Sequence, residues 1–289
     1  MVFIGLDDIA DYKKDFDRQN SMRKKLADQL GISGFCRCID STELRPLGQS
    51  YQRDIETLSS KAKEDGMNIC TDGARIKRAR DIVGDAPIRI AAVIGFPWGT
   101  AGEDAKRAEI RAYAKLADEY DAVANAGLLL SGSMHSYASE IKSMAISSSR
   151  LDKPLKVIIS TYAMDHRQIV EISGMVREIG KDCGCEIGVK NSQGFPVMGY
   201  SKTDVSARME DVWLMRVGVG EYEKDNMVMV KAAGGISDLD TALDFMLAAG
   251  AIDNKGRLAV PKKSIDSYIR IGSSSASKLA EQFRSRYAA

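Results

Sequence analysis

Short apolar runs alternate with longer amphipathic segments along most of this chain, and the alternation constrains the fold more than any other feature. It is typical of parallel strands that are joined by crossover helices. The eight predicted strands are residues 34–40, 66–71, 87–96, 120–127, 154–161, 185–191, 227–235 and 267–273. Because a helix-like segment follows each run, we predict an α/β fold, a (β/α)8 TIM barrel, rather than an open doubly wound sheet.

The first 30 residues lie outside this pattern and predict one charged amphipathic helix. Its apolar positions include Ile9, Phe16, Met22, Leu26 and Leu30. We expect residues 1–30 to form an N-terminal helical extension that caps the barrel or contacts another subunit. Residues 31–289 are expected to form a single barrel domain. The polar stretch at 251–266, before the last predicted strand, indicates a loop or a short hairpin.

Composition narrows the functional classes. The 289 residues carry 41 Lys and Arg against 40 Asp and Glu, and a net charge of +1 gives no general attraction to nucleic acid or to anionic membranes. No run approaches the roughly 18 apolar residues of a membrane helix, and the acidic start lacks the pattern of a signal peptide. We therefore expect a cytoplasmic protein that acts on a small molecule.

The five cysteines do not suggest a disulfide framework, because their number is odd and the chain is long. Cys36 with Cys38, and Cys183 with Cys185, form C-x-C pairs in strand-like apolar runs. They could in principle hold a metal ion. Buried core thiols are the preferred interpretation, since free cysteine is among the most buried residue types.

Two lysines end neighbouring strands of the predicted barrel. Lys190 ends "EIGVK" and Lys231 ends "MVMVK", so both amines should face the mouth at the carboxyl ends of the strands, where barrel active sites lie. Burial and a second nearby ammonium both disfavour the charged form of a lysine. A neutral amine is the nucleophile that Schiff-base chemistry requires. The alternative is that each lysine reaches water or pairs with a carboxylate.

Asp121, within the fourth predicted strand, is the candidate for proton transfer, which imine chemistry also requires. A structural ion pair with Lys156 is the alternative, because an acidic residue in an apolar strand needs a partner. The two roles can coexist. His135 and His166 fall in predicted helices beyond strand ends, which indicates solvated positions.

A phosphate site is indicated by "KAAGGIS" after the seventh strand and "RIGSSSAS" after the eighth. Glycine backbone amides, serine hydroxyls and a helix N-terminus together favour an anion. Each motif alone also fits ordinary turns and helix caps. Their occurrence on the two strands where barrels commonly bind phosphate indicates a phosphorylated substrate.

Several segments resemble the deoxyribose-phosphate aldolase family, in that family's order, over roughly residues 36–280. They are "VIGFPWG" at 93–99, "ADEYDAVANAG" at 117–127, "LKVIIST" at 155–161, "VKNSQGF" at 189–195, "EDVWLMRVGVG" at 210–220, "VKAAGGI" at 230–236 and "IGSSS" at 271–275; "IDST" at 39–42 also resembles the family's first strand end. The resemblance implies a class I aldolase that cleaves 2-deoxy-D-ribose 5-phosphate to acetaldehyde and D-glyceraldehyde 3-phosphate. No metal ion or other cofactor is expected.

By this resemblance Lys190 would form the imine, Lys231 would favour its neutral form, and Asp121 with Lys156 would transfer protons. Supporting residues at the mouth would be Asp40, Thr42, Cys70 and Asn191. The predicted phosphate contacts are Gly194, Gly234, Gly235, Gly272, Ser274 and Ser275. A homo-oligomer, with a dimer favoured, is also expected.

The chain departs from the family pattern beside the nucleophile and at the phosphate site. It has "KNSQG" where the family usually has "KTSTG", Ser237 where arginine is common, and Ser160 in place of a glutamate; residues 196–209 and 251–266 enlarge two loops. These changes affect the substrate more than the reaction. The alternatives are a Schiff-base aldolase for another phosphorylated aldehyde or ketone, and a non-catalytic sugar-phosphate-binding barrel. A metal-dependent aldolase is less favoured, because no histidine cluster with metal-ligand spacing is present.

Overall fold

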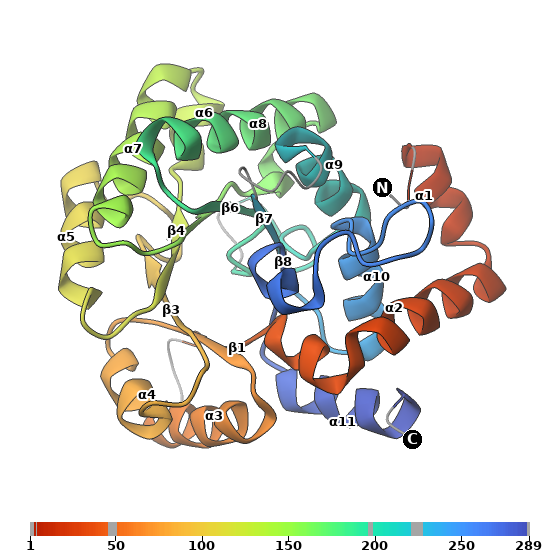
Figure 1. The fold of residues 1–289 in the computed structure, drawn as a ribbon. Coiled ribbons are helices and arrows are strands. Elements are labelled where there is room, and N and C mark those ends of the chain that lie inside the picture. Colours follow the sequence, from red (N-terminus) through yellow and green to blue (C-terminus); the bar gives the residue numbers. More distant parts are fainter. Residues whose placement is uncertain (1–2, 4, 46–50, 196–198, 221–227, 288–289) are drawn as a thin grey trace.

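The computed structural model describes residues 3, 5–45, 51–195, 199–220 and 228–287. Its centre is a closed barrel in which eight parallel strands pair in sequence order (Figure 1). The strands are β1 (Ile39–Glu43), β2 (Asn68–Thr71), β3 (Ile90–Ile94), β4 (Glu119–Val123), β5 (Leu155–Ile158), β6 (Ile187–Lys190), β7 (Met229–Ala233) and β8 (Ile269–Ser273). The predicted (β/α)8 barrel is confirmed.

A ring of helices surrounds the barrel (Figure 1). The ring and its connections comprise α3 (Tyr51–Asp65), α4 (Ile76–Val83), α5 (Glu103–Tyr113), α6 (Ala126–Leu130), α7 (Met134–Ser149), η1 (Thr161–Ala163), α8 (His166–Cys183), α9 (Met209–Val219), α10 (Leu239–Ala248), η2 (Lys262–Ser267) and α11 (Ala276–Tyr287). Their apolar faces and the outward side chains of the strands form the main core. Helix starts are marked by local chemistry, such as the capping box of Asp165 and Gln168 at α8.

The strands are shorter than the sequence predicted, and the first predicted strand overlaps the end of a helix. Residues 34–37 form the last turn of a helix, and β1 begins at Ile39. The physical reason is packing, because Phe35 stacks on Phe283 of α11 with ring centroids 4.6 Å apart. Beyond β4 and β5, the ends of the predicted runs form the short helices α6 and η1. Met227, in the predicted seventh strand, lies outside the described residues.

The N-terminal segment forms two helices, so the prediction of one helix was wrong. Helix α1 (Leu6–Tyr12) is separated from α2 (Phe16–Arg37) at Asp15, whose side chain caps α2 by accepting from the Arg18 N–H at 2.9 Å. Gly31, with a φ of 58°, breaks the helical path within α2. The division of the chain at residue 30 stays a prediction.

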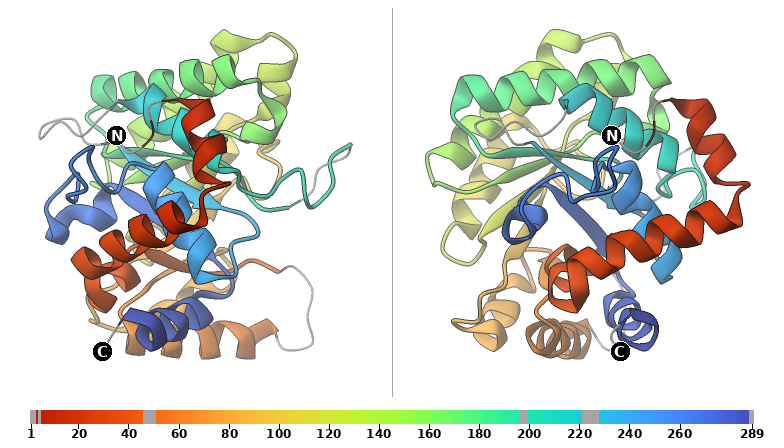
Figure 2. Two further views of the ribbon diagram at one scale, coloured as in Figure 1. Left: turned by 90° about the vertical axis from the view of Figure 1, so that its right-hand side faces the viewer. Right: turned by 45° about the vertical axis from the view of Figure 1, so that its right-hand side comes forward.

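Helix α2 lies outside the ring, against α10 and α11 (Figure 2). Ile9, Leu26 and Leu30 are buried as predicted, whereas Phe16 is 70% exposed. Arg23 joins α2 to α10, since its Nε donates to Asp244 Oδ1 at 2.7 Å, and Tyr12 donates to the same oxygen at 2.6 Å. The extension is therefore attached to the barrel by buried polar contacts as well as by apolar packing.

The polar stretch at 251–266, expected to be a loop or a short hairpin, contains a short hairpin and the start of η2. Ile252 and Leu258 form an antiparallel bridge, and η2 then leads into β8. This hairpin lies at the amino-terminal end of the barrel, on the side opposite residues 199–205 (Figure 2, left). The enlargement therefore does not border the mouth.

All five cysteines are free thiols. Cys36, Cys38 and Cys185 are buried, in agreement with the core interpretation, although Cys36 lies in a helix and Cys183, at the end of α8, is half-buried. Among the described residues, none of the helices has both the length and the apolar character needed to cross a bilayer. No group of three His, Cys, Asp or Glu side chains in these same residues could hold a metal ion.

A buried ion pair outside the barrel fixes the end of β4, the strand that carries Asp121. Lys106 of α5 donates to Glu140 of α7 at 2.7 Å and to the Val123 carbonyl oxygen at 2.8 Å. The second Glu140 oxygen accepts from the Asn125 N–H at 2.9 Å. Burial lowers the pKa of the Lys106 ammonium although Glu140 acts to raise it.

We predict that Lys106→Met lowers the free energy of unfolding by about 3–5 kcal/mol, because it leaves Glu140 charged and buried without its cation. Chemical denaturation followed by circular dichroism measures this change. Lys115→Met, an exposed control with the same loss of charge, should have little effect. Equal stability of the two variants would show that the pair does not hold the end of β4.

Candidate active site

The barrel register brings the two predicted lysines together. Lys190 of β6 and Lys231 of β7 are direct Cα partners, so their side chains share the inner face of the barrel. Their ammonium nitrogens bond to the same oxygen, Asp121 Oδ2, at 2.9 and 2.7 Å. The two amines therefore lie within about 6 Å of each other, close enough for strong charge coupling.

The four predicted catalytic residues belong to one buried ion network. Lys156 lies 3.1 Å from Asp121 Oδ1, so three lysines surround this carboxylate. Lys231 also lies 2.5 Å from Asp40 Oδ2. Lys156 lies 2.6 Å from Glu119. The network closes through Arg270 of β8, which pairs with Asp40 and with Glu119.

The resulting ring of alternating charges has six members. They are Asp121, Lys231, Asp40, Arg270, Glu119 and Lys156. Lys190 is attached to the ring at Asp121. Four cationic side chains of this set meet three carboxylates, and Arg89 also approaches Glu119 at 3.8 Å.

Burial and charge act in opposite directions on these groups. Burial would raise the pKa of Asp121, but Lys156, Lys190 and Lys231 hold it well below its usual range. Burial would also raise the pKa values of Asp40 and Glu119, but Arg270 and the neighbouring lysines together lower them. Burial would lower the pKa of Lys231, but Asp121 and Asp40 raise it above its ordinary value. Lys231 is therefore charged at neutral pH.

Sequence reasoning missed Arg270 and Glu119. Arg270 occurs inside the apolar run "YIRIG", and a fully buried arginine needs carboxylate partners, so this residue could have been recognised. Glu119 directly precedes the predicted fourth strand, which begins one residue earlier than expected. Its position inside the barrel could not be inferred without that boundary.

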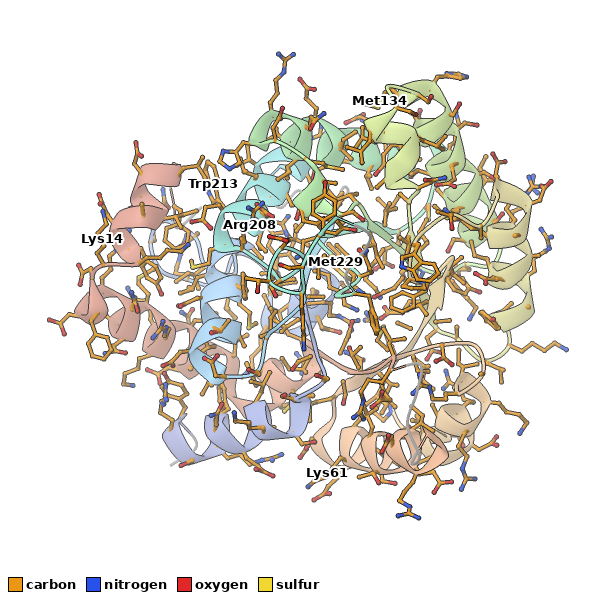
Figure 3. All side chains as sticks on the ribbon, turned by 180° about the vertical axis from the view of Figure 1, so that it is seen from behind. Lys14, Lys61, Met134, Arg208, Trp213 and Met229 are labelled. Atoms are coloured by element: carbon orange, nitrogen blue, oxygen red, sulfur yellow. The ribbon has the colours of Figure 1, made fainter. Side chains whose placement is uncertain are left out.

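A pocket of about 720 Å³ opens at the carboxyl ends of the strands, with Lys190 in its wall. Figure 3 views this end of the barrel. Six further predicted residues line it: Thr42, Gly194, Gly234, Gly235, Gly272 and Ser274. Glu43, Arg45, Gln193, Phe195, Lys202 and Ser237 contribute to the same wall. The structure therefore gathers most of the predicted binding residues around the candidate nucleophile.

Four predicted binding residues do not line this pocket. Asp40 belongs to the ion ring, and the thiol of Cys70 donates to Asp121 at 3.6 Å, with burial raising its pKa to about 11. Asn191 is fully buried and bonds to both the N–H and the carbonyl of Ala233 on β7. Ser275 donates its N–H to Ser273 Oγ at the start of α11. These residues support the pocket from behind.

Gln193 and Ser160, two of the departures from the family pattern, contact each other. Ser160 donates to Gln193 Oε1 at 3.4 Å, and Gln193 Nε2 donates to the Tyr162 hydroxyl at 2.7 Å. Ser160 has a φ of 60°, which is unusual for a residue other than glycine. The two changed residues therefore form one polar contact, and Gln193 lines the pocket with Lys190. His135 and His166 are exposed, as predicted.

Comparison with known proteins gives the family. A deoxyribose-phosphate aldolase of Caldicellulosiruptor saccharolyticus is 34% identical over 216 residues, which cover 74% of this chain and 89% of that protein. The chain belongs to the deoxyribose-phosphate aldolase family. The "Deoxyribose-phosphate aldolase 1" of Staphylococcus aureus strain N315 is 33% identical over 75% of this chain and 90% of that protein. No family model matches the chain.

Solved structures place this deoxyribose-phosphate aldolase family member among known barrels. The structure described as "QR15, an Aldolase" is 25% identical, with a TM-score of 0.66 over 88% of this chain and 97% of that one. A deoxyribose phosphate aldolase from Aeropyrum pernix, described as tetrameric, shares the fold at 21% identity and a TM-score of 0.67; it covers 92% of this chain and 98% of that one. The family resemblance read from the sequence motifs is confirmed.

The lowered carboxylate pKa values predict how stability depends on pH. A carboxylate whose pKa is lower in the folded protein stabilises it above the ordinary pKa, near 4, and this stability is lost as the pH falls. We predict that the free energy of unfolding falls between about pH 5 and 3, and that Asp121→Asn makes this fall shallower. Urea denaturation at a series of pH values measures both slopes.

The exposed Asp85→Asn provides the matched control for this change of charge, and its slope should equal that of the wild type. A slope in Asp121→Asn as steep as that of Asp85→Asn would contradict the role assigned to the buried carboxylate.

Proposed function

We propose that this protein reversibly cleaves 2-deoxy-D-ribose 5-phosphate to acetaldehyde and D-glyceraldehyde 3-phosphate, with Lys190 as the nucleophile. One observation carries the proposal: of the three lysines around Asp121, only Lys190 lines the pocket among the described residues. Lys156 and Lys231 lie deeper, within the ion ring. A substrate carbonyl in the pocket would therefore meet the Lys190 amine first.

Asp121 keeps two cationic partners when Lys190 reacts. They are Lys156 and Lys231, so attack by a neutral Lys190 amine does not leave the buried carboxylate unpaired. Lys231, held in its charged form by Asp40 and Asp121, repels a second ammonium beside it. A free lysine amine close to neutral pH is the requirement for attack on an aldehyde.

The proposed reaction begins when the Lys190 amine adds to the aldehyde carbon and water leaves, which forms a protonated imine. A base then takes the proton of the 3-hydroxyl, and the bond between carbons 2 and 3 breaks. The electron pair of this bond moves toward the imine nitrogen and gives an enamine, while glyceraldehyde 3-phosphate departs. Protonation of the enamine at carbon 2 and addition of water release acetaldehyde and restore the Lys190 amine.

Asp121 is placed to exchange protons with Lys190 at 2.9 Å. Because its pKa is held well below the usual range, it is a carboxylate in the resting protein and begins as an acceptor. Lys156 does not line the pocket and acts through its contact with Asp121. We therefore treat Asp121 as catalytic and Lys156 as a positioning residue.

The same chemistry on a different phosphorylated aldehyde or ketone is the second candidate. It is favoured by Gln193, which lines the pocket with Lys190 and is hydrogen-bonded to Ser160 and Tyr162. A non-catalytic sugar-phosphate-binding barrel is the third candidate, and the intact contacts of Lys190 with Asp121 argue against it.

We further propose a homo-oligomer, first of all a dimer, that works in the cytoplasm. Free thiols at all five cysteines fit a reducing compartment. Exposed apolar side chains such as Phe16 and Trp98 offer surface for contact between copies. Light scattering of the purified protein measures the oligomeric state.

Imine trapping tests the nucleophile. We predict that borohydride added with deoxyribose 5-phosphate gives a stable adduct, which peptide mapping and mass spectrometry locate on Lys190. Lys190→Met should abolish the adduct and the activity, whereas Lys153→Met, with a lysine outside the pocket, should retain both. An adduct on another lysine would refute the assignment, and an adduct formed only with another phosphorylated aldehyde or ketone would support the second candidate.

Lys231→Leu tests the electrostatic role of the second lysine. Removing this cation leaves Asp121 with Lys156 and Lys190, and Asp40 with Arg270, and it ends the repulsion between Lys231 and Lys190. Lys190 should therefore hold its proton to higher pH. We predict loss of most activity near neutral pH and partial recovery at high pH, with the rise of the rate profile displaced by about one pH unit or more. Steady-state rates between pH 6 and 10 measure this shift. An equal loss at every pH would show that Lys231 acts by positioning or by proton transfer.

A further inference from the structure

Three cationic side chains line the pocket within the described part of the chain: Lys190, Arg45 and Lys202. Lys190 is hydrogen-bonded to Asp121 and is the nucleophile of the proposed reaction. The pocket wall around Gly234, Gly235 and Ser274 contributes backbone groups and a hydroxyl, and the neighbouring Ser237 carries no charge. A phosphate at this wall therefore depends on Arg45 or Lys202 for a cationic partner.

Arg45 is already paired. Its Nε donates to Glu43 Oε1 at 3.0 Å, its Nη2 contacts the other oxygen of the same carboxylate, and Asp54 lies 3.4 Å away. Two carboxylates thus lie against the Arg45 guanidinium, and Glu43 also pairs with Arg75 at 3.4 Å. By contrast, the Lys202 ammonium forms no ion pair with any residue that the structure describes.

The segment that carries Lys202 is docked on the glycine turn after β7. The Ala207 N–H donates to the Gly234 carbonyl at 3.0 Å, and Ser192 Oγ, two residues after Lys190, donates to the Val205 carbonyl at 2.7 Å. The approach is close, because a Cβ at Gly234 would lie 2.9 Å from the Val205 oxygen. Residues 199–205 project at the mouth side of the barrel (Figure 2, left), and Arg208 marks the start of α9 in Figure 3.

Local hydrogen bonds give this segment a defined backbone. Asp204 Oδ2 accepts from both the N–H and the hydroxyl of Ser201, at 2.6 and 2.7 Å. The Ser206 hydroxyl donates to the Lys202 carbonyl at 3.0 Å. The Lys202 backbone is thereby held beside the glycine turn, while its side chain is exposed to the pocket.

We propose that Lys202 is a specificity-determining residue that binds the phosphate group of the substrate. Its ammonium supplies the positive charge beside Gly234, Gly235 and Ser274 that the neutral Ser237 does not. This inference rests on the proposed function, since it assumes a phosphorylated substrate in this pocket. An exposed ammonium suits a phosphate that enters from solvent, and its attraction is weakened by salt.

The test compares Lys202→Met with Lys263→Met, which removes an exposed lysine next to β8 at the opposite end of the barrel. For deoxyribose 5-phosphate we expect Lys202→Met to raise KM about 5- to 20-fold with kcat within twofold, the effect of one lost charge-assisted contact. The ratio of kcat/KM for deoxyribose 5-phosphate to that for unphosphorylated deoxyribose should fall by the same factor. Lys263→Met should keep the wild-type ratio.

A binding measurement separates this inference from the proposed activity. Calorimetric titration with inorganic phosphate, at low and at physiological salt, should show weaker binding in Lys202→Met. The double variant Lys202→Met with Ser237→Arg should recover it, because arginine returns a cation to the same wall. Weaker phosphate binding in a protein without cleavage activity would refute the activity and leave the role of Lys202 supported. Equal phosphate affinity in wild type and Lys202→Met, or an equal loss on both sugars, would overturn the inference.

Discussion

The three ion pairs between Asp121 and the surrounding lysines are the interactions on which the rest of the barrel interior depends. A carboxylate buried without partners would be severely destabilising, so Lys156, Lys190 and Lys231 must reach it together. Their strands are paired in the register that permits this, with Asp121 opposite Lys156 and Lys190 opposite Lys231. A slip of one residue in any of these strands would turn a charged side chain toward the apolar helices.

The sequence predicted the parts of the molecule that depend on local pattern. Polar residues at strand ends identified Lys190 and Lys231, because in a parallel barrel all strand ends of one kind share a face. Asp121 was identified as an acidic residue within an apolar strand. The short apolar runs, each followed by a helix-like segment, predicted the parallel strands of the barrel. Local pattern also predicted a loop or short hairpin at 251–266, where Ile252 and Leu258 form an antiparallel bridge.

The remaining features depend on contacts between distant residues. Periodicity could not show that Arg270 closes a ring with Glu119, 151 positions away, or that the last turn of α2 is stabilised by Phe283. Nor could it show that Asn191 faces the backbone of β7 rather than the pocket, since both orientations suit a polar residue after a strand. The catalytic roles and the substrate stay predictions, because geometry places the groups without showing them react.

The ion ring has a consequence for how such a barrel can change over evolutionary time. Each ring member pairs with two others, so a single substitution in the ring takes away one partner from each of two buried charges. A second, compensating substitution must accompany it. The rim is different, since Gln193, Ser237 and Lys202 contact hydroxyls, backbone or solvent. New substrates can therefore be explored one rim substitution at a time, while the interior is inherited as a unit.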